Sequence, residues 1–191
     1  MNDGKNLVNR RRGGIMSIIY KSPYQAYPFL SDASEDLRCD FEIYTDKVAS
    51  MTGMLIAECD EPELRDELLK VEELIYHSNP TLRTKLTLTE DEVIWLKKRV
   101  DYWNEETKGR CEQFVLPCGS KRASLAHVLR AEAKGLVRLL YRYKENNHFV
   151  DNQLIDFMNL LSGYFFVIAL ELNNIDGVEE IPYKSRNYPS K

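Results

Sequence analysis

The chain has 191 residues, a formal net charge of −4 at pH 7, 43% hydrophobic residues and 29% charged residues. This length suffices for one domain with a sizeable core, and the negative charge argues against a general nucleic-acid-binding protein, which is usually basic. Four cysteines without CxxC spacing, and no uninterrupted apolar run of membrane length, favour a cytoplasmic protein with reduced thiols and with neither a metal site nor a membrane partner.

The first 34 residues are predicted to form an irregular N-terminal arm that contains the basic run Arg10–Arg12 and two prolines. A short apolar stretch at residues 15–20 is a strand candidate, although one strand cannot build a sheet alone. A first helix is predicted over residues 35–59, because apolar side chains recur there at helical spacing: Phe41, Val48, Met51 and Leu55.

Four further helices follow along the chain. Thr89 stands three residues before Glu92, which resembles a capping box and begins a helix that ends near residue 106. Ser120 caps a helix that continues to about residue 146, and another covers residues 151–173. Before these, a helix over residues 61–77 is indicated by an apolar stripe: Leu64, Leu68, Val71, Leu74 and Ile75.

Five amphipathic helices with mostly short connections indicate an all-α fold, a five-helix antiparallel bundle. We therefore divide the chain into an arm (residues 1–34), a single bundle domain (35–176) and a C-terminal tail (177–191). The tail contains two prolines and is expected to be extended or loose.

The loop Phe114–Ser120 and the helix that follows it carry the chemistry that is easiest to recognise. Arg130, Lys134 and Arg138 recur every four residues and therefore stack along one helix face. Such a row beyond a Gly-Ser helix start could grip a polyphosphate. The pattern alone favours a solvated basic face, but the spacing leaves both interpretations open. The opposite side carries apolar side chains that can enter the core: Leu125, Val128, Leu136 and Leu139.

Three segments resemble a known family. The loop Phe114–Ser120, followed by Ala126–Arg130, is similar to the FxLPGG(T/S) and LHxAR signature of the PduO-type ATP:cob(I)alamin adenosyltransferases. Residues 158–167 resemble the family's LNRLSDYLFV motif, and residues 173–180 its NxxxGxxE continuation. Residues 36–46 more weakly resemble its DPRxEAYGTVDE segment. The likeness spans most of residues 36–183.

The resemblance implies a cobalamin adenosyltransferase-like, ferritin-like bundle that assembles as a homotrimer with sites at the subunit interfaces. The reaction would be attack of cob(I)alamin cobalt on the 5′ carbon of ATP, with triphosphate leaving, so cobalamin, ATP and Mg²⁺ are the implied ligands. A corrinoid reductase and an adenosylcobalamin-dependent enzyme are the implied further partners.

The resemblance also implies roles for individual residues. Phe114 and Phe166 would lie on the corrin side, where Phe114 helps remove the lower axial ligand of cobalt. Arg130 would contact ATP and pair with Asp46 of the first helix. The further ATP ligands would be Lys134, Arg138 and Asn159. His127 matches the signature histidine, and we assign it no catalytic role.

Several positions depart from the family pattern, mostly on the ATP side. The glycine-rich TGDxGxT loop has no counterpart near the N-terminus, and the arginine pair after Arg130 becomes Lys134-Gly135. The motif's arginine and aspartate become Leu160 and Gly163. Lysine keeps the charge but loses the two-pronged guanidinium donor.

Three functions therefore stay open from the sequence. The first is an active, divergent adenosyltransferase, in which the basic arm replaces the missing phosphate loop. The second is a non-catalytic corrinoid-binding carrier or regulator that has lost ATP. The third is a helical interaction module whose resemblance is only ancestral.

Overall fold

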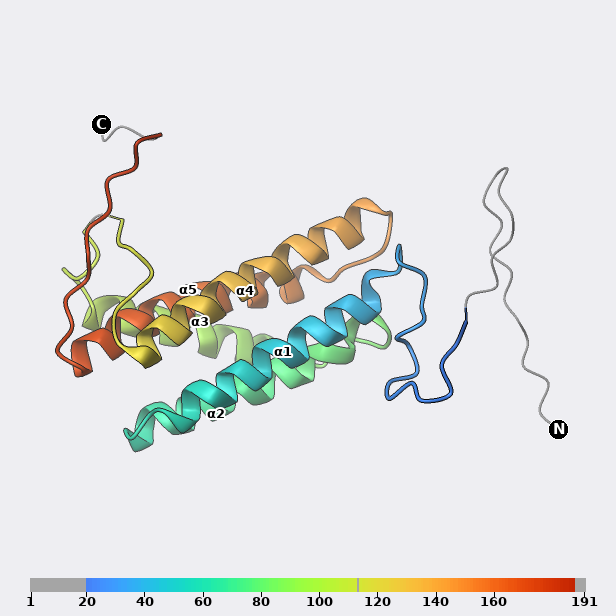
Figure 1. Ribbon diagram of the computed structural model, residues 1–191, viewed down its shortest axis with the longest axis horizontal. Helices are drawn as coiled ribbons and strands as arrows, with labels where there is room; N and C mark the ends of the chain where they lie inside the picture. Colours follow the sequence, from blue (N-terminus) through green and yellow to red (C-terminus); the bar gives the residue numbers. More distant parts are fainter. Residues whose placement is uncertain (1–19, 113, 188–191) are drawn as a thin grey trace.

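The computed structural model describes residues 20–112 and 114–187, and within these ranges it is a helical bundle without a strand longer than a single bridge (Figure 1). The predictions for Arg10–Arg12 and most of the strand candidate at residues 15–20 lie outside the described residues. The predicted all-α class is confirmed. The elements are α1 (Leu37–Ala57), α2 (Pro62–Ser78), the 3₁₀ helix η1 (Asn79–Leu82), α3 (Glu90–Glu106), α4 (Lys121–Glu145) and α5 (Asn152–Ile175).

Short polar side chains begin four of the five α-helices. Asp36, Ser120 and Asp151 each accept a hydrogen bond from a backbone N–H of the first turn. Thr89 and Glu92 form the predicted capping box, each side chain accepting from the other residue's backbone N–H. These bonds satisfy N–H groups that have no partner within the helix, so local sequence defines where the helices start.

Helix α5 is the centre of the core, packing against α3 and α4, while α1 packs against α2 and α4. By length and composition it could cross a membrane, with a mean hydropathy of 1.5 over its most apolar window. The helix is nevertheless not an uninterrupted apolar run, because Asp156, Asn159 and Glu171 lie within it. Because 67% of that window is buried inside the bundle, the apolar composition is explained by core packing.

The predicted apolar stripe of α2 is buried throughout. On α4, Leu136 and Leu139 are buried and Leu125 packs at the edge of the core, but Val128 remains 45% exposed, contrary to prediction. Val128 precedes the fully buried Leu129 by one residue and is therefore turned about 100° away from it around the helix.

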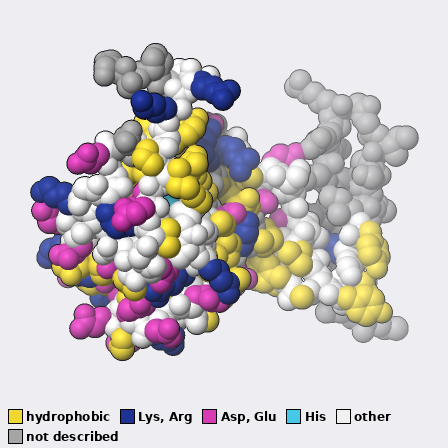
Figure 2. Space-filling view, turned by 60° about the vertical axis from the view of Figure 1, so that its left-hand side comes forward, with side chains coloured by type: hydrophobic (Ala, Val, Ile, Leu, Met, Phe, Trp, Pro, Cys, Tyr) yellow, Lys and Arg dark blue, Asp and Glu magenta, His cyan; other side chains and the backbone are white. Residues whose placement is uncertain are grey.

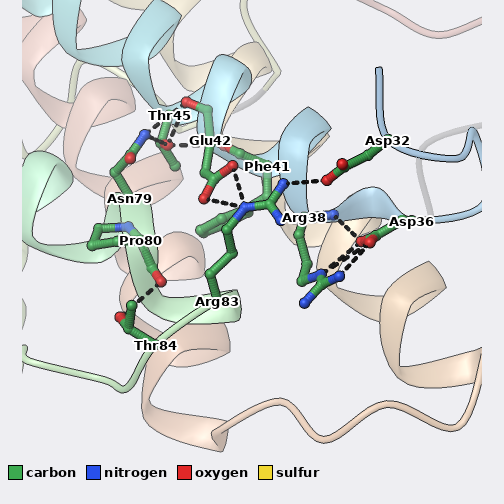
Figure 3. A network of polar contacts seen from close by, with 10 residues as sticks. All are labelled: Asp32, Asp36, Arg38, Phe41, Glu42, Thr45, Asn79, Pro80, Arg83 and Thr84. Atoms are coloured by element: carbon green, nitrogen blue, oxygen red, sulfur yellow. Dashed lines mark hydrogen bonds and ion pairs between the residues drawn. The ribbon is translucent and has the colours of Figure 1, made fainter. Parts of the chain in front are cut away.

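The last part of the N-terminal arm is docked against the bundle through Arg83, which follows η1 (Figure 3). The Arg83 guanidinium donates to Glu42 of α1 at 2.7 and 2.8 Å and to Asp32 of the arm at 2.8 Å. Its carbon also lies 3.6 Å from the centre of the Phe29 ring. Residues 29–32 are thus held by one arginine, although the sequence predicted only an irregular segment there.

Candidate functional site

The loop Phe114–Ser120 lies between the end of α5 and the C-terminal tail. The Leu116 N–H donates to the Ile181 carbonyl at 2.9 Å, and the Tyr183 N–H donates to the Phe114 carbonyl at 2.7 Å. These bonds flank a single antiparallel bridge between Val115 and Pro182. Figure 1 shows this tail, in red, at the same end of the bundle as the loop that precedes α4. The tail is extended as predicted, but it is held rather than loose.

Asn173, fully buried near the end of α5, fixes the C-terminal half of the loop. Its side-chain oxygen accepts from the Ser120 N–H at 2.9 Å, and its Nδ2 donates to the Cys118 carbonyl and to Glu180, both at 3.3 Å. Gly119 has φ +141°, and a Cβ there would lie 2.0 Å from the Asn173 oxygen. Only glycine therefore permits this contact, which places Ser120 to cap α4.

Replacing Gly119 by alanine is accordingly expected to disrupt the loop. The added Cβ must displace Asn173 and must also adopt a backbone conformation that disfavours side chains, so we expect a loss of ~2–3 kcal/mol in the free energy of unfolding. Urea denaturation checks this value. The matched control is Gly109→Ala, because Gly109 also has positive φ but no atom within 4 Å of its added Cβ. Equal losses in the two variants would show that the Asn173 contact contributes nothing.

Exposed apolar side chains from the loop and the tail form one surface, which we call the apolar patch: Phe114, Leu116, Ile181 and Tyr183. Phe114 is 76% exposed and Ile181 53% exposed. Figure 2, which faces this end of the bundle, shows yellow side chains gathered beneath the tail. Large apolar side chains grouped on a surface are typical of a binding site for an apolar partner or ligand.

The cation row on α4 has no ion-pair partner among the described residues. Arg130, Lys134 and Arg138 form no ion pair and no side-chain hydrogen bond with any of them, and Lys134 and Arg138 are exposed. Six other arginines do have acceptors: Arg38, Arg65, Arg83, Arg99, Arg110 and Arg122. The row therefore presents positive charge that no described carboxylate neutralises, on the helix that follows the loop.

Arg130 and His127 lie next to Phe166 of α5. The guanidinium carbon of Arg130 is 5.8 Å from the centre of the Phe166 ring, and the His127 ring centre is 6.2 Å from it. His127 is only 3% exposed. Burial, and secondarily the neighbouring Arg130 charge, lower the pKa of His127 to about 4, so this imidazole is neutral at physiological pH.

That lowered pKa predicts a pH-dependent loss of stability. Below about pH 6.5 the unfolded chain protonates this histidine while the folded chain does not, so folding loses ~2 kcal/mol between pH 7 and pH 5 from this group. The loss should continue until the pH reaches the folded pKa. Urea denaturation at both pH values, in the unmodified protein and in His127→Leu, isolates this contribution. An identical pH dependence in the two proteins would contradict the neutral buried imidazole.

The remaining predicted site residues lie apart from this group. Asp46 is exposed on α1 and accepts a hydrogen bond from the Tyr76 hydroxyl at 2.6 Å. Among the described residues it forms no ion pair with Arg130. Asn159 lies in a groove between α3 and α5, where its Nδ2 donates to the Ile155 carbonyl. No group of three or more metal-ligating side chains occurs in the described part of the chain.

Sequence reasoning missed Asn173 and the tail as supports of the loop. Residues 173–180 match a family motif, but the motif does not indicate that Asn173 contacts Gly119, which is 54 positions away in the chain. Arg110 completes the support by donating to the Val178 carbonyl and pairing with Glu180 at 2.9 Å. A glycine directly before a helix cap was the one local signal of a close approach.

Comparisons with known proteins agree with this geometry. The family model described as cobalamin adenosyltransferase matches residues 34–172. A curated corrinoid adenosyltransferase from Bacillus subtilis (strain 168) is 28% identical over 159 residues, covering 78% of this chain and 81% of the relative.

Solved structures give the same fold. A variant of the PduO-type ATP:corrinoid adenosyltransferase from Lactobacillus reuteri, complexed with cobalamin and ATP, has a TM-score of 0.70 at 21% identity and covers 78% of this chain and 87% of that one. A second variant, complexed with ATP, has a TM-score of 0.70 at 23% identity and covers 78% and 88%.

Proposed function

Since the chain belongs to the cobalamin adenosyltransferase family, we propose that it transfers the 5′-deoxyadenosyl group of ATP to cob(I)alamin and releases triphosphate. The electron pair of cobalt attacks C5′, a cobalt–carbon bond forms, and the bond from C5′ to the triphosphate oxygen breaks. The observation that carries the proposal is the cation row of α4, which has no ion-pair partner among the described residues. This helix directly follows the loop that carries Phe114 and Leu116 of the apolar patch.

The cation row supplies the anionic half of the site. Arg130, Lys134 and Arg138 span eight residues of α4, or about 12 Å, which suits an extended triphosphate. Positive charge placed where the leaving group gains negative charge stabilises the transition state more than the ground state. Asn159, on the facing helix α5, is the proposed further contact to ATP. Mg²⁺ would enter bound to the phosphates of ATP.

The apolar patch supplies the corrin half. Phe114 projects from a loop that is fixed by the tail and by Asn173, so its ring is displayed without being part of the core. In this role it contacts the corrin and excludes the lower axial ligand from cobalt. Phe166 is partly exposed on α5 and is the proposed second aromatic contact to the corrin, on the side of the site that carries Arg130.

The site is proposed to be completed between subunits of a homotrimer. Asp46 accepts a hydrogen bond from Tyr76 of its own chain, and Arg130 lacks a carboxylate partner among the described residues, so the predicted Arg130–Asp46 pair would form between neighbouring copies. Mixing inactive Arg130→Ala and Asp46→Ala chains tests this arrangement, because composite sites with both native residues would then regain activity.

The cellular setting is part of the same proposal. We place the protein in the cytoplasm, where its four cysteines stay reduced. A corrinoid reductase would supply its substrate, and an adenosylcobalamin-dependent enzyme would receive its product.

A non-catalytic corrinoid-binding role is the second candidate, and one observation favours it. The groove between α3 and α5 around Asn159 is lined by Leu160 and Gly163, where the family motif has an arginine and an aspartate. ATP would therefore find fewer charged partners there than in the family pattern.

An anaerobic visible spectrum separates the two roles. The purified protein is mixed with chemically reduced cob(I)alamin and MgATP, and the absorbance of the adenosylated product is followed with time. Product formation that requires both the protein and ATP supports the transferase. A spectral shift of cob(II)alamin on binding, without any product, supports the carrier.

A further inference from the structure

Buried polar atoms of two side chains meet at the Phe166 ring. Both ring nitrogens of His127 and the Nε of the partly exposed Arg130 are buried, and none has a hydrogen-bond partner among the described residues. The two residues are three apart on α4 and therefore lie on the same helix face. Phe166 lies within 6.2 Å of the one and 5.8 Å of the other.

Such atoms are rare in folded proteins, because a buried donor or acceptor that loses its water typically costs ~1–3 kcal/mol. A phenylalanine ring cannot replace the missing hydrogen bonds. His127, at 3% exposure, is also too enclosed for bulk water to satisfy it. A cost of this kind is expected where the polar atoms are kept for a ligand.

Phe166 contacts both residues and also borders an open space. Its ring lines a surface pocket of about 470 Å³ between the end of α3, the following loop and α5. Leu170, one turn further along α5, and Thr107, at the end of α3, line the same pocket. The ring is only partly buried, and it is the side chain that both borders this pocket and contacts His127 and Arg130.

We propose that His127 and Arg130 form a covered polar site for a peripheral carboxamide of the corrinoid, and that Phe166 turns aside to admit it. The proposal rests on the proposed function and names the group that the corrin half recognises. The carboxamide oxygen accepts from the Arg130 Nε–H, and its NH₂ donates to the unprotonated nitrogen of His127. The terminal nitrogens of Arg130 stay available to the triphosphate and to Asp46 of a neighbouring copy.

The chemistry favours a carboxamide over a phosphate. A neutral imidazole has one donor and one acceptor nitrogen, and the lowered pKa keeps His127 neutral. A phosphate offers only acceptors and would leave the acceptor nitrogen unpaired. A carboxamide presents an acceptor for the Arg130 Nε–H and a donor for the acceptor nitrogen of His127, so it can pair with both kinds of atom, and corrinoids carry several such groups on the ring edge.

The test measures equilibrium binding of cob(II)alamin and, separately, of MgATP to the full chain, together with thermal melting at pH 7.5. His127→Leu removes the polar nitrogens and keeps an apolar side chain in the core. We expect its Kd for cob(II)alamin to rise about tenfold, the net value of one hydrogen bond, and its Kd for MgATP to stay within about twofold. Its melting temperature should rise by ~2–4 °C, because an unpaired polar group has left the core.

Two further variants complete the experiment. His127→Gln keeps a donor and an acceptor and should bind cob(II)alamin within about threefold of the unmodified protein. His77→Leu changes an exposed histidine on α2 and should alter neither affinity. A lower melting temperature for His127→Leu with unchanged cob(II)alamin binding would overturn the inference, and so would a loss confined to MgATP or a failure of His127→Gln to bind. If the unmodified protein itself does not bind cob(II)alamin, the proposed function fails together with the inference.

Discussion

Replacing Arg130 by alanine is expected to lower kcat/KM for adenosyl transfer by roughly 10²–10³-fold while leaving the bundle folded. Arg130 contacts the Phe166 ring but has no ion-pair or hydrogen-bond partner among the described residues, so its removal breaks no internal ion pair. What it removes is the proposed donor to the leaving triphosphate. Lysine at this position keeps the charge but loses the forked geometry and should recover only part of the rate.

The matched control is Arg142→Ala. Arg142 is an exposed arginine in the last turn of the same helix, 12 residues or about 18 Å beyond Arg130. Anaerobic initial rates and circular dichroism are measured on both variants. Comparable rates for Arg130→Ala and the unmodified protein would contradict the proposed leaving-group contact.

Replacing Phe114 by alanine is expected to slow turnover that starts from cob(II)alamin by roughly 10–100-fold. Turnover from pre-reduced cob(I)alamin should fall much less, because the ring is proposed to displace the lower axial ligand before reduction. Since Phe114 is 76% exposed, the variant should unfold at the same urea concentration as the unmodified protein. The two rates, measured on the same preparation, give the comparison.

Phe149→Ala serves as the control for this variant, since Phe149 is 86% exposed in the connection between α4 and α5. It should leave both turnover rates unchanged. Equal losses from cob(II)alamin and cob(I)alamin in Phe114→Ala would instead assign the ring a general packing role.

The helices could be predicted from the sequence because their signals are local. In the Thr89–Glu92 capping box and in the Ser120 cap, the bonded residues are three positions apart in the chain. The apolar stripe of α2 follows the helical period. Each of these depends on neighbours in the chain, whose spacing is fixed by helix geometry.

The supports of the candidate site depend on contacts between distant residues. Asn173 meets Gly119 across 54 positions, and Arg83 meets Asp32 across 51. No periodicity marks such pairs, because the partners belong to different elements. Sequence reasoning therefore proposed Phe114 and Arg130 as site residues, but it predicted neither the contacts that hold the loop nor the burial of His127 against Phe166.

The positions that depart from the family pattern do not disturb the bundle. A Cβ at Gly135 would meet only Tyr44 at 3.8 Å, and one at Gly163 only Val100 at 3.7 Å, which are ordinary contacts. These glycines are thus not required by packing. In the proposed site their effect falls on the charges available to ATP, where Lys134 and Arg138 would replace the missing arginine pair.

The most direct test of adenosyl transfer is to count both products of one anaerobic reaction. Unmodified protein is incubated with limiting cob(I)alamin and excess MgATP, and the adenosylated corrinoid and the released triphosphate are quantified by chromatography. The proposed reaction yields one triphosphate for each cobalt–carbon bond, and neither product without the protein. Bound corrinoid that is recovered without an adenosyl group, with ATP unconsumed, would contradict it.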